Sequence, residues 1–352
     1  MSKRTTISDI AKAMGVAPST VYKALSGNKG VNDKNREKIQ QVAENLGYVT
    51  KSSKVKGACK NVVALFPDPA IYDYEFYAFI WSGIRKRASE LSLFGLKVTE
   101  FTFNGTTEDQ LRILNELLAN QKEETGDKID GIVTLVWDEN FFLEVIDDFD
   151  KLGIPFFTIN SDAPSSLRVA AVQTNSYQTG RLAAEYLGSV IPEDGTVIIT
   201  GTKRNAVSHE KTTRGFIDQM AITNPDIQVI ELYENQKSPN NLMETIKNML
   251  DSVPNIRGLY ANNARTTSLI GKLLFHNSHK NKLKIVGSEV SKDAVFYLNN
   301  GVFNALIDEQ PYTQGYQCIS IVYDFVCKSL PVKQTNYVSL NLVLQNNLPT
   351  NM

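Results

Sequence analysis

Thr6-Ile-Ser-Asp-Ile-Ala-Lys-Ala-Met-Gly-Val-Ala-Pro-Ser-Thr-Val-Tyr-Lys-Ala-Leu-Ser26 is the stretch that decides how this chain is organised. Thr6 is typical of a helix N-cap with Asp9 as its reciprocal acid, and apolar residues follow at helical spacing until Gly15 ends the helix. Pro18 suits the first turn of a second helix, because a missing N–H group costs nothing there. Two short helices around a tight turn are the layout of a helix-turn-helix that reads DNA.

A third helix is predicted from Asn32, as its cap, to Leu46, with Gly47 placed to close it. Residues 1–60 hold twelve Lys or Arg against four Asp or Glu, so they carry a net charge of +8, whereas the remaining 292 residues carry −9. A basic head on an acidic body is typical of a chain whose first segment binds a polyanion. The alternative is a solvated helical cap whose lysines only maintain solubility.

Thr6 to Tyr48 resembles the DNA-binding headpiece of the LacI/GalR family of bacterial transcription regulators. The matching elements are Asp-Ile-Ala (9–11), Gly-Val (15–16), Ser-Thr-Val (19–21), Gly27, Val31, Arg36 and Leu-Gly-Tyr (46–48). The resemblance implies an all-α three-helix headpiece (1–50), a basic linker or hinge (51–60) and an α/β two-lobed periplasmic-binding-protein-like body with two parallel sheets (61–352).

The helix faces and the resemblance together predict the residues that contact DNA. Ser19, Tyr22 and Lys23 point away from the apolar face of the second helix and are expected at base edges, whereas Thr20 and Arg36 are expected at phosphates. In the linker, relatives insert a leucine wedge into the minor groove, but by spacing Gly57 stands at that position here. The linker is therefore expected to act mainly through phosphate contacts. The predicted DNA-binding residues are Thr6, Ser19, Thr20, Tyr22, Lys23, Lys34, Arg36, Lys54 and Val55.

From residue 61 onward, short β-rich runs alternate with amphipathic helices, a pattern that favours parallel sheets with crossover helices. Strands are expected near 62–66, 96–101, 131–136, 154–159, 196–200, 227–232, 257–261 and 283–287. Helices are expected near 75–91, 107–121, 140–151, 176–190, 207–221, 239–251 and 264–276. Two lobes of similar size fit better than one long sheet. Lobe 1 is predicted at about 61–163 and 292–326, and lobe 2 at about 164–291 and 327–352, with crossings near 162–168, 290–293 and 325–335.

The crevice of such a fold lies outside the carboxyl ends of the strands. Those positions are rich in carboxylate, amide and aromatic side chains, which suit the hydroxyls and the apolar C–H face of a carbohydrate. The body also resembles the sugar-binding relatives of the family, for example at Gln173–Ala184 and Ile285–Glu289, which implies a sugar or sugar-acid effector. The predicted effector-binding residues are Tyr74, Phe76, Trp137, Asp138, Asn160, Asp162, His209, Asn263, Arg265, Glu289 and Gln310.

Plainer explanations exist for part of this set. Tyr74 and Phe76 can pack a helix against its sheet, and Asn160 and Asp162 can form a turn before Pro164. The chain also departs from the family, because Thr212 stands where many relatives carry an arginine that grips the effector. His209, Lys211 or Arg204 could take over that role. These departures leave the sugar unnamed.

Other function classes lack their signatures. No Gly-x-Gly-x-x-Gly follows the first predicted strand, and no Gly-Lys-Ser or Gly-Lys-Thr loop occurs, so we expect neither an enzyme nor a cofactor. The three cysteines, Cys59, Cys318 and Cys327, and the pair His276 and His279 lack metal-ligand spacing, so we expect no metal site.

The sequence predicts a cytoplasmic homodimer that binds operator DNA and represses carbohydrate genes until a sugar relieves it. A cytoplasmic location is expected because no secretory signal and no apolar run of membrane length occur, and a coiled-coil tetramer is not expected because the C-terminal end lacks heptads. Activation by the ligand, or DNA binding that requires it, stays open. A transport-type sugar receptor is the nearest alternative, and the basic head argues against it.

Overall fold

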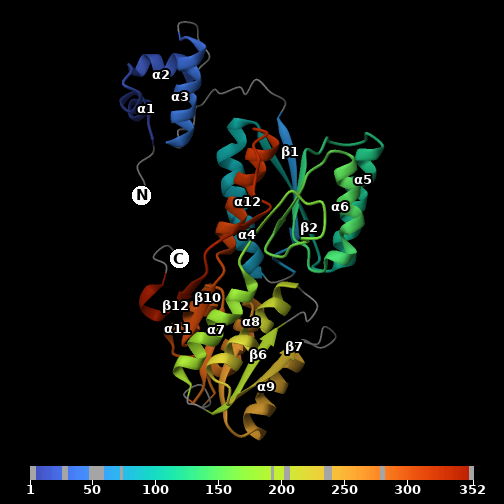
Figure 1. The fold of residues 1–352 in the computed structure, drawn as a ribbon, viewed down its shortest axis with the longest axis vertical. Coiled ribbons are helices and arrows are strands. Elements are labelled where there is room, and N and C mark those ends of the chain that lie inside the picture. Colours follow the sequence, from blue (N-terminus) through green and yellow to red (C-terminus); the bar gives the residue numbers. More distant parts are fainter. Residues whose placement is uncertain are drawn as a thin grey trace.

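The computed structural model describes residues 5–25, 31–46, 59–71, 74–191, 194–201, 207–233, 240–277 and 282–348, and for residues 33, 44, 74, 75 and 240 it describes the backbone alone. A small helical headpiece precedes a two-lobed α/β body (Figure 1). The predicted fold class is confirmed.

The headpiece consists of α1 (Ile7–Met14), α2 (Pro18–Leu25) and α3 (Asp33–Asn45). Thr6 caps α1 as predicted, since its backbone N–H donates to Asp9 Oδ2 at 2.8 Å and its Oγ1 accepts from the backbone N–H of Asp9 at 3.4 Å. Gly15 ends α1 with a φ of +63°. The three helices share one small core of Ile10, Ala11, Val21, Ala24, Ile39 and Ala43.

Lobe 1 is a three-layer α/β/α unit. Its elements are β1 (Lys60–Pro67), α4 (Tyr74–Leu91), β2 (Leu96–Phe103), α5 (Thr107–Lys122), β3 (Gly131–Thr134), α6 (Leu143–Lys151), β4 (Phe156–Ile159), β5 (Ala170–Gln173), α12 (Pro311–Val326) and β11 (Thr335–Tyr337). The strand order is β11-β5-β4-β3-β1-β2, and the pairs are parallel. Helices α4 and α12 lie on one side of the sheet and α5 and α6 on the other (Figure 1). Both faces are therefore covered, which explains why β1 is a nearly continuous buried apolar run.

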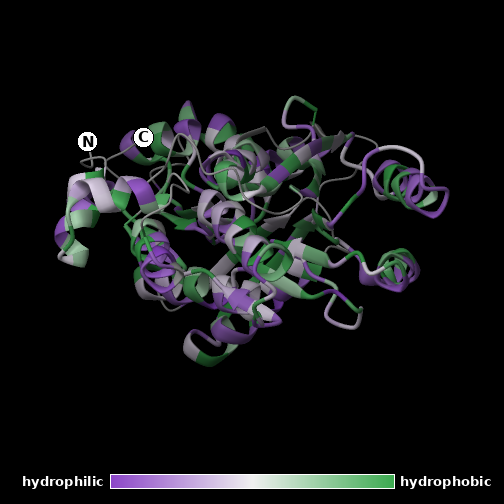
Figure 2. Ribbon diagram, turned by 90° about the horizontal axis from the view of Figure 1, so that it is seen from above, coloured by the Kyte–Doolittle hydropathy of each residue, from purple (hydrophilic) through white to green (hydrophobic). Residues whose placement is uncertain are grey.

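Lobe 2 repeats this architecture. Its elements are α7 (Ser176–Val190), β6 (Gly195–Gly201), α8 (Val207–Thr223), β7 (Ile227–Tyr233), α9 (Asn240–Ser252), β8 (Ile256–Ala261), α10 (Ala264–Phe275), β9 (Lys284–Ser288), α11 (Lys292–Asn299), β10 (Ala305–Asp308) and β12 (Asn341–Val343). The strand order is β12-β10-β9-β8-β6-β7, in which only β12 runs antiparallel to its neighbour. In Figure 2 the strands are predominantly hydrophobic, and hydrophilic residues lie on the outer helices.

The chain crosses between the lobes later than the sequence indicated. The structure places the crossings at 174–175, 309–310 and 338–340, instead of near 162–168, 290–293 and 325–335. Lobe 1 keeps the chain longer because β5 still pairs with β4, with Ala170 opposite Phe157. In the same way, lobe 2 keeps α11 and β10. The C-terminal segment 335–343 contains two short strands, of which β11 belongs to lobe 1 and β12 to lobe 2.

A close helix crossing positions the start of α8. A Cβ atom added to Gly180 of α7 would meet the backbone carbonyl of Thr212, and one added to Gly215 of α8 would meet the carbonyl of Tyr177. Only glycine permits this backbone approach at both positions. The approach fixes the first turns of α8, which border the crevice between the lobes.

Within the described ranges, no helix combines the length and the apolar character that spanning a membrane requires.

We expect Gly180→Ala to lower the free energy of unfolding by about 3 kcal/mol, because overpacking against fixed backbone costs ~1–3 kcal/mol or more. The matched control is Gly188→Ala on the same helix, whose added Cβ would meet the side chain of Asn224, which can rotate away at the cost of its hydrogen bond to the carbonyl of Gly188. Urea denaturation measures both variants. Equal costs would mean that the close approach of α7 and α8 is not fixed.

Candidate functional site

The exposed face of α2 carries the side chains predicted to read bases. Val21 and Ala24 are buried, whereas Ser19, Tyr22 and Lys23 are exposed, with 58% of Tyr22 accessible. Side chains on the outward face of the second helix of a helix-turn-helix are the ones that can reach base edges. Thr20 is half-buried and Lys34 is exposed at the start of α3, whereas Lys54 and Val55 lie outside the described residues.

Arg36, predicted as a phosphate contact, is hydrogen-bonded within the headpiece. Its Nη1 donates to the backbone carbonyl of Ala24 at 2.9 Å and to that of Lys23 at 3.3 Å, at the C-terminal end of α2. A guanidinium at this end satisfies orphan carbonyls and complements the helix dipole. Arg36 therefore fixes the helix that presents Tyr22 and Lys23, and Thr6 similarly serves as the cap of α1.

A polar crevice lies between the lobes at the carboxyl ends of both sheets, where the sequence placed it. Six of the predicted effector-binding residues line it, and they come from four strand ends and two helix starts. The lining consists of Phe76, Tyr77, Trp137, Asn160, Ser208, His209, Thr212, Asn262, Asn263, Ala264, Glu289 and Glu309.

The backbone turns sharply at two of these strand ends. Asn160 after β4 and Glu289 after β9 have φ values of +66° and +69°, which non-glycine residues rarely adopt. Each nevertheless keeps its sheet hydrogen bond, Asn160 N to Val172 O at 2.9 Å and Glu289 N to Ile307 O at 2.7 Å. Left-handed conformations at non-glycine residues cluster at functional sites, because the surrounding structure must hold them. Both side chains end in the crevice.

The two lobes are closed onto each other. The backbone N–H of Val207, at the start of α8, donates to the carbonyl of Trp137 in lobe 1 at 3.2 Å. The space left in the crevice is about 50 Å³. Ligand pockets usually measure ~300 Å³ or more, so a ligand of ordinary size can enter this crevice only when the lobes separate.

Two carboxyl groups dominate the chemistry of the crevice. Glu289 is 3% exposed. Glu309 accepts a hydrogen bond from Thr174 Oγ1 at 2.8 Å, and burial raises its pKa to about 7, an effect to which neighbouring Asp308 adds. A carboxyl group with such a pKa exists in both protonation states near neutrality, so it can donate or accept a hydrogen bond.

Asp162, predicted as an effector contact, lies outside the crevice lining in a buried ion pair. Arg168 Nε donates to Asp162 Oδ1 at 2.6 Å and Nη2 donates to Oδ2 at 2.7 Å. Thr158 Oγ1 also donates to Oδ1, and Arg168 Nη1 donates to the carbonyl of Gln334 beside β11. The carboxylate is thus used to tie the β4–β5 connection to the C-terminal part of lobe 1.

Gln310, predicted as an effector contact, does not line the crevice. It connects two of the segments at which the chain crosses between the lobes. Its Nε2 donates to the carbonyl of Ser339 at 2.7 Å, so it joins the second crossing to the third. The bond from Thr174 to Glu309 joins the first crossing to the second. The three segments on which the lobes move are therefore hydrogen-bonded side by side.

The other three residues predicted to bind the effector are not part of the described crevice lining. Asp138 caps a short 3-10 helix through Asn140 N at 3.1 Å, Arg265 lies on α10 outside the lining, and the side chain of Tyr74 is outside the described residues. The sequence reasoning missed Tyr77, Ser208, Thr212, Asn262, Ala264 and Glu309. The position directly after Leu306-Ile307-Asp308 could have indicated Glu309, had that run been taken as a strand.

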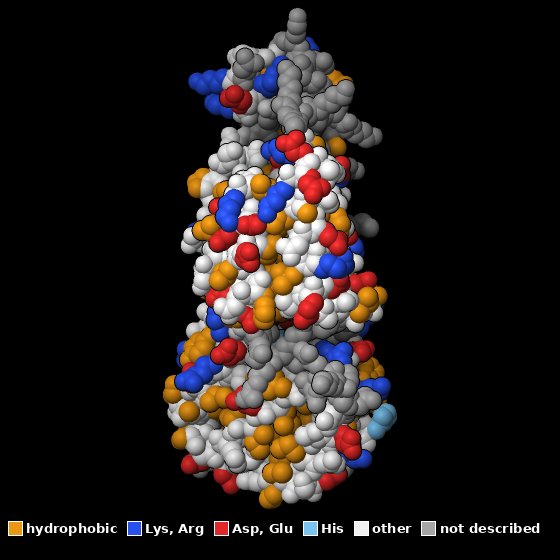
Figure 3. All heavy atoms as spheres, turned by 90° about the vertical axis from the view of Figure 1, so that its right-hand side faces the viewer, with side chains coloured by type: hydrophobic (Ala, Val, Ile, Leu, Met, Phe, Trp, Pro, Cys, Tyr) orange, Lys and Arg blue, Asp and Glu red, His pale blue; other side chains and the backbone are white. Residues whose placement is uncertain are grey.

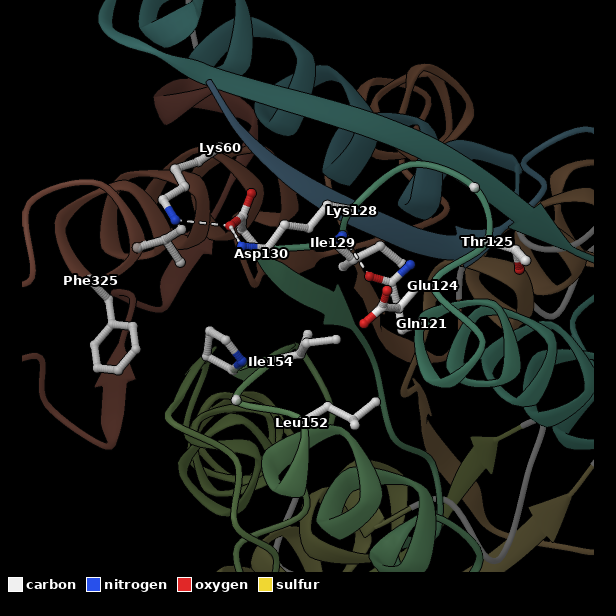
Figure 4. Close-up of a pocket in the computed structure, with 14 residues that line it drawn as sticks. Lys60, Gln121, Glu124, Thr125, Lys128, Ile129, Asp130, Leu152, Ile154 and Phe325 are labelled. Carbon is white, nitrogen blue, oxygen red and sulfur yellow. Dashed lines mark hydrogen bonds and ion pairs between the residues drawn. The ribbon is translucent and has the colours of Figure 1, made fainter. Parts of the chain in front are cut away.

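A larger cavity of about 610 Å³ lies at the opposite, amino edge of the lobe 1 sheet (Figure 4). Of its two carboxylates, Glu124 and Asp130, the second is already used, because Asp130 accepts from Lys60 Nζ and from the backbone N–H of Asn61, both at 2.9 Å. Gln121 is likewise used, since its Oε1 accepts from Ile129 N at 2.9 Å. Asp130 and Gln121 thus hold the walls of this cavity together, whereas the polar groups of the crevice come from both lobes. The crevice is therefore the better candidate site.

Two protein families match this chain. The periplasmic binding protein domain matches residues 69–329, and the bacterial regulatory proteins of the lacI family match residues 6–51. The body is therefore a periplasmic-binding-protein domain. Residues 6–51 are a lacI-family helix-turn-helix domain, so the chain joins a DNA-binding headpiece of that family to a periplasmic-binding-protein body.

Curated relatives are regulators rather than enzymes. The chain is 27% identical over 191 residues to the HTH-type transcriptional regulator DegA of Bacillus subtilis, a match that covers 53% of this chain and 52% of DegA. It is 25% identical over 185 residues to the sucrose operon repressor of Streptococcus mutans, covering 51% of each. The chain thus spans about half the length of the curated relatives that it matches.

Solved structures share the fold. GanP, a glucose-galactose binding protein from Geobacillus stearothermophilus, matches with a TM-score of 0.71 at 24% identity, covering 82% of this chain and 99% of GanP. A LacI transcriptional regulator from Bacteroides fragilis, whose assignment is provisional, matches with a TM-score of 0.72 at 20% identity, covering 82% and 98%. At these identities, the likeness establishes the fold alone.

We expect Asp162→Ala to lower the free energy of unfolding by ~3–5 kcal/mol, because it leaves the Arg168 guanidinium buried without its carboxylate. The double variant Asp162→Leu with Arg168→Met should recover most of this loss. Asp127→Ala, which breaks the exposed pair with Lys97, is the control and should cost under ~1 kcal/mol. Urea denaturation gives all three values. If Asp162→Ala costs no more than the control, the buried ion pair of Asp162 and Arg168 does not stabilise lobe 1.

The raised pKa of Glu309 predicts a pH-dependent stability. The folded state favours the protonated carboxyl, so its contribution is complete below the ordinary pKa of 4.5 and is lost as pH rises through about 7. Glu309→Gln does not titrate. The variant should therefore gain stability relative to the natural chain between pH 5 and pH 8, by on the order of 1–3 kcal/mol. Thermal unfolding across this range measures the difference, and parallel curves would show that Glu309 has an ordinary pKa.

Proposed function

We propose that this chain is a sequence-specific transcriptional regulator, a repressor of carbohydrate genes, whose affinity for operator DNA is set by a carbohydrate bound between its lobes. One observation carries the proposal. The same chain joins a helix-turn-helix headpiece, with Tyr22 and Lys23 exposed on α2, to a crevice lined from both lobes by amides, carboxyls and aromatic rings.

The headpiece supports the DNA-binding half. With twelve basic residues against four acidic ones, residues 1–60 attract a polyanion, while the acidic remainder of the chain does not. A sugar receptor for transport would have the same two-lobed fold, but that function does not explain a basic helix-turn-helix headpiece. Because operator DNA lies in the bacterial cytoplasm, we infer that the protein works there.

The hinge supports the ligand-controlled half. Effector binding requires separation and renewed closure of the lobes around the ligand, and only a ligand that favours one lobe arrangement can shift DNA affinity. Relief of repression is the direction that we propose. The opposite direction is an outcome that the operator experiment below reads directly.

We also propose that the protein acts as a homodimer. A helix-turn-helix monomer contacts one half-site, and two copies related by two-fold symmetry read a palindromic operator. Hydrophobic side chains gather on the lower lobe in Figure 3, whereas charges of both signs are interspersed over lobe 1. An exposed hydrophobic group of this kind is a surface that a second copy can cover.

Selection of the full chain against random duplex DNA tests the proposal. We expect a palindromic site with half-sites one helical turn apart, and a loss of affinity for it when the effector carbohydrate is added. Lys23→Ala should change the preferred base at one position of each half-site, at a cost of ~1–3 kcal/mol.

Lys34→Ala is the matched control, since it should weaken all sites alike and reduce the slope of log affinity against log salt by ~0.9 per headpiece. A uniform loss with Lys23→Ala would make that lysine a phosphate contact. Failure to select any site, or an operator affinity that no carbohydrate changes, would refute the function.

A further inference from the structure

Glu309 lies at the point where the hinge and the crevice meet. It follows β10 directly, in the second crossing between the lobes, and it also lines the crevice. Its Oε2 accepts from Thr174 Oγ1 in the first crossing at 2.8 Å, and its backbone carbonyl accepts from Gln314 Nε2 in the first turn of α12, also at 2.8 Å. The carboxyl group is therefore fixed to the hinge, so a movement of the hinge changes its surroundings.

Lobe closure determines how much water reaches this carboxyl group. Phe76 and Trp137 of lobe 1 line the same crevice and are buried, so apolar rings close it opposite the strand ends of lobe 2. Glu309 is half-buried in the closed crevice, whose remaining space is about 50 Å³. When the lobes separate, water replaces the rings of lobe 1. A carboxyl group that is hydrated in this way regains its ordinary pKa.

The neighbouring titratable groups do not supply Glu309 with a counter-charge. Those on the described elements around it are Tyr77 of α4, His209 of α8, Tyr260 of β8, Glu289 after β9 and Asp308 of β10. Burial raises the pKa of the Tyr260 phenol, and Glu309 and Glu289 raise it further, so both carboxyl groups lie near that ring. In the described part of the chain, no lysine or arginine forms an ion pair with Glu309. Its surroundings in the closed form therefore favour a neutral carboxyl group.

We propose that closure of the lobes is coupled to a proton on the carboxyl group of Glu309, which binds the proton when the lobes close over it and releases it when they separate. The inference rests on the proposed function, because it takes lobe closure as the step that an effector controls. The proton is exchanged with water, and no other bond forms or breaks. Acidification therefore favours closed lobes in this protein, and a rise in pH favours their separation.

The direction and the pH range follow from the two states of this carboxyl group. Burial, to which Asp308 adds, raises the pKa of Glu309 in the closed form to about 7 from its ordinary value of 4.5, although the hydrogen bond from Thr174 limits the rise. The closed form binds the proton more tightly, so its advantage is complete below the ordinary pKa and is lost as pH rises through about 7. For these two pKa values, linkage predicts that the equilibrium for closure falls ~tenfold between pH 6 and pH 8.

Amide hydrogen exchange of the full chain, without DNA or carbohydrate, measures closure directly. The Val207 N–H is at the start of α8, where no carbonyl of the helix can accept from it, and it donates to the carbonyl of Trp137 in lobe 1 at 3.2 Å. It exchanges when the lobes separate. Its protection, corrected for the intrinsic pH dependence of exchange, therefore reports the closure equilibrium even when separation is rare. The Asn160 N–H, bonded to Val172 O within lobe 1, is the matched control.

We expect the protection of Val207 to fall ~tenfold between pH 6 and pH 8, while that of Asn160 changes by less than about twofold. In Glu309→Gln, an uncharged isostere of the protonated group, the protection of Val207 should not change with pH. Thr174→Val tests the inference independently, because it removes the bond that favours the charged carboxylate and should move the fall to higher pH by ~1 pH unit. Glu185→Gln, at an exposed position of α7, is the control variant and should keep the natural profile.

A profile for Val207 that is flat in the natural chain overturns the inference. A fall that persists in Glu309→Gln also overturns it, and its loss in His209→Gln would then assign the proton to the imidazole of the same crevice. If the profile titrates as expected, operator affinity should change over the same pH range in the natural chain relative to Glu309→Gln. If operator affinity does not change, the coupling of closure to the proton stands, and the proposed control of DNA binding by lobe closure fails.

Discussion

The hydrogen bonds that join the three crossing segments are the constraint on which the rest of this structure depends. Thr174 donates to Glu309, and Gln310 donates to the carbonyl of Ser339. The three crossing segments, which together form the hinge, therefore lie side by side and bend together. Because each crossing follows the carboxyl end of a strand, the hinge also forms one side of the crevice. A ligand that contacts Glu309 therefore contacts the hinge directly.

This placement gives the ligand a physical route to the arrangement of the lobes. In the closed form, Val207 N donates to the carbonyl of Trp137, and α8 is held close to α7 by two glycines. In the proposed mechanism, a ligand between the lobes replaces the direct contact by contacts of its own and so selects a lobe separation. The buried pair of Asp162 and Arg168 keeps lobe 1 rigid while this happens. Coupling to the headpiece follows if operator binding favours one separation over the other.

The sequence predicted the elements well and the connections less well. Long amphipathic runs such as 176–190 and the capping box at Thr6 carry strong local signals, and both are found in the structure as expected. The four-residue strands β5 and β10 carry too few residues for a periodicity, and this shifted the predicted crossings. The same error displaced the predicted site residue from Glu309 to Gln310. Roles decided by tertiary partners, such as Arg36 on the carbonyls of α2 and Asp162 on Arg168, have no signal in the local sequence at all.

The central claim is that the effector binds in the narrow crevice and not in the wider cavity at the far edge of lobe 1. Hydrogen–deuterium exchange of the full chain, with and without the tightest-binding sugar, tests it directly. The account predicts slower exchange at residues 159–161, 207–213, 288–291 and 308–311, with no change at 124–130 and 152–155. Slower exchange confined to the latter segments would contradict it, because it would place the ligand beside Lys60 and Asp130 instead.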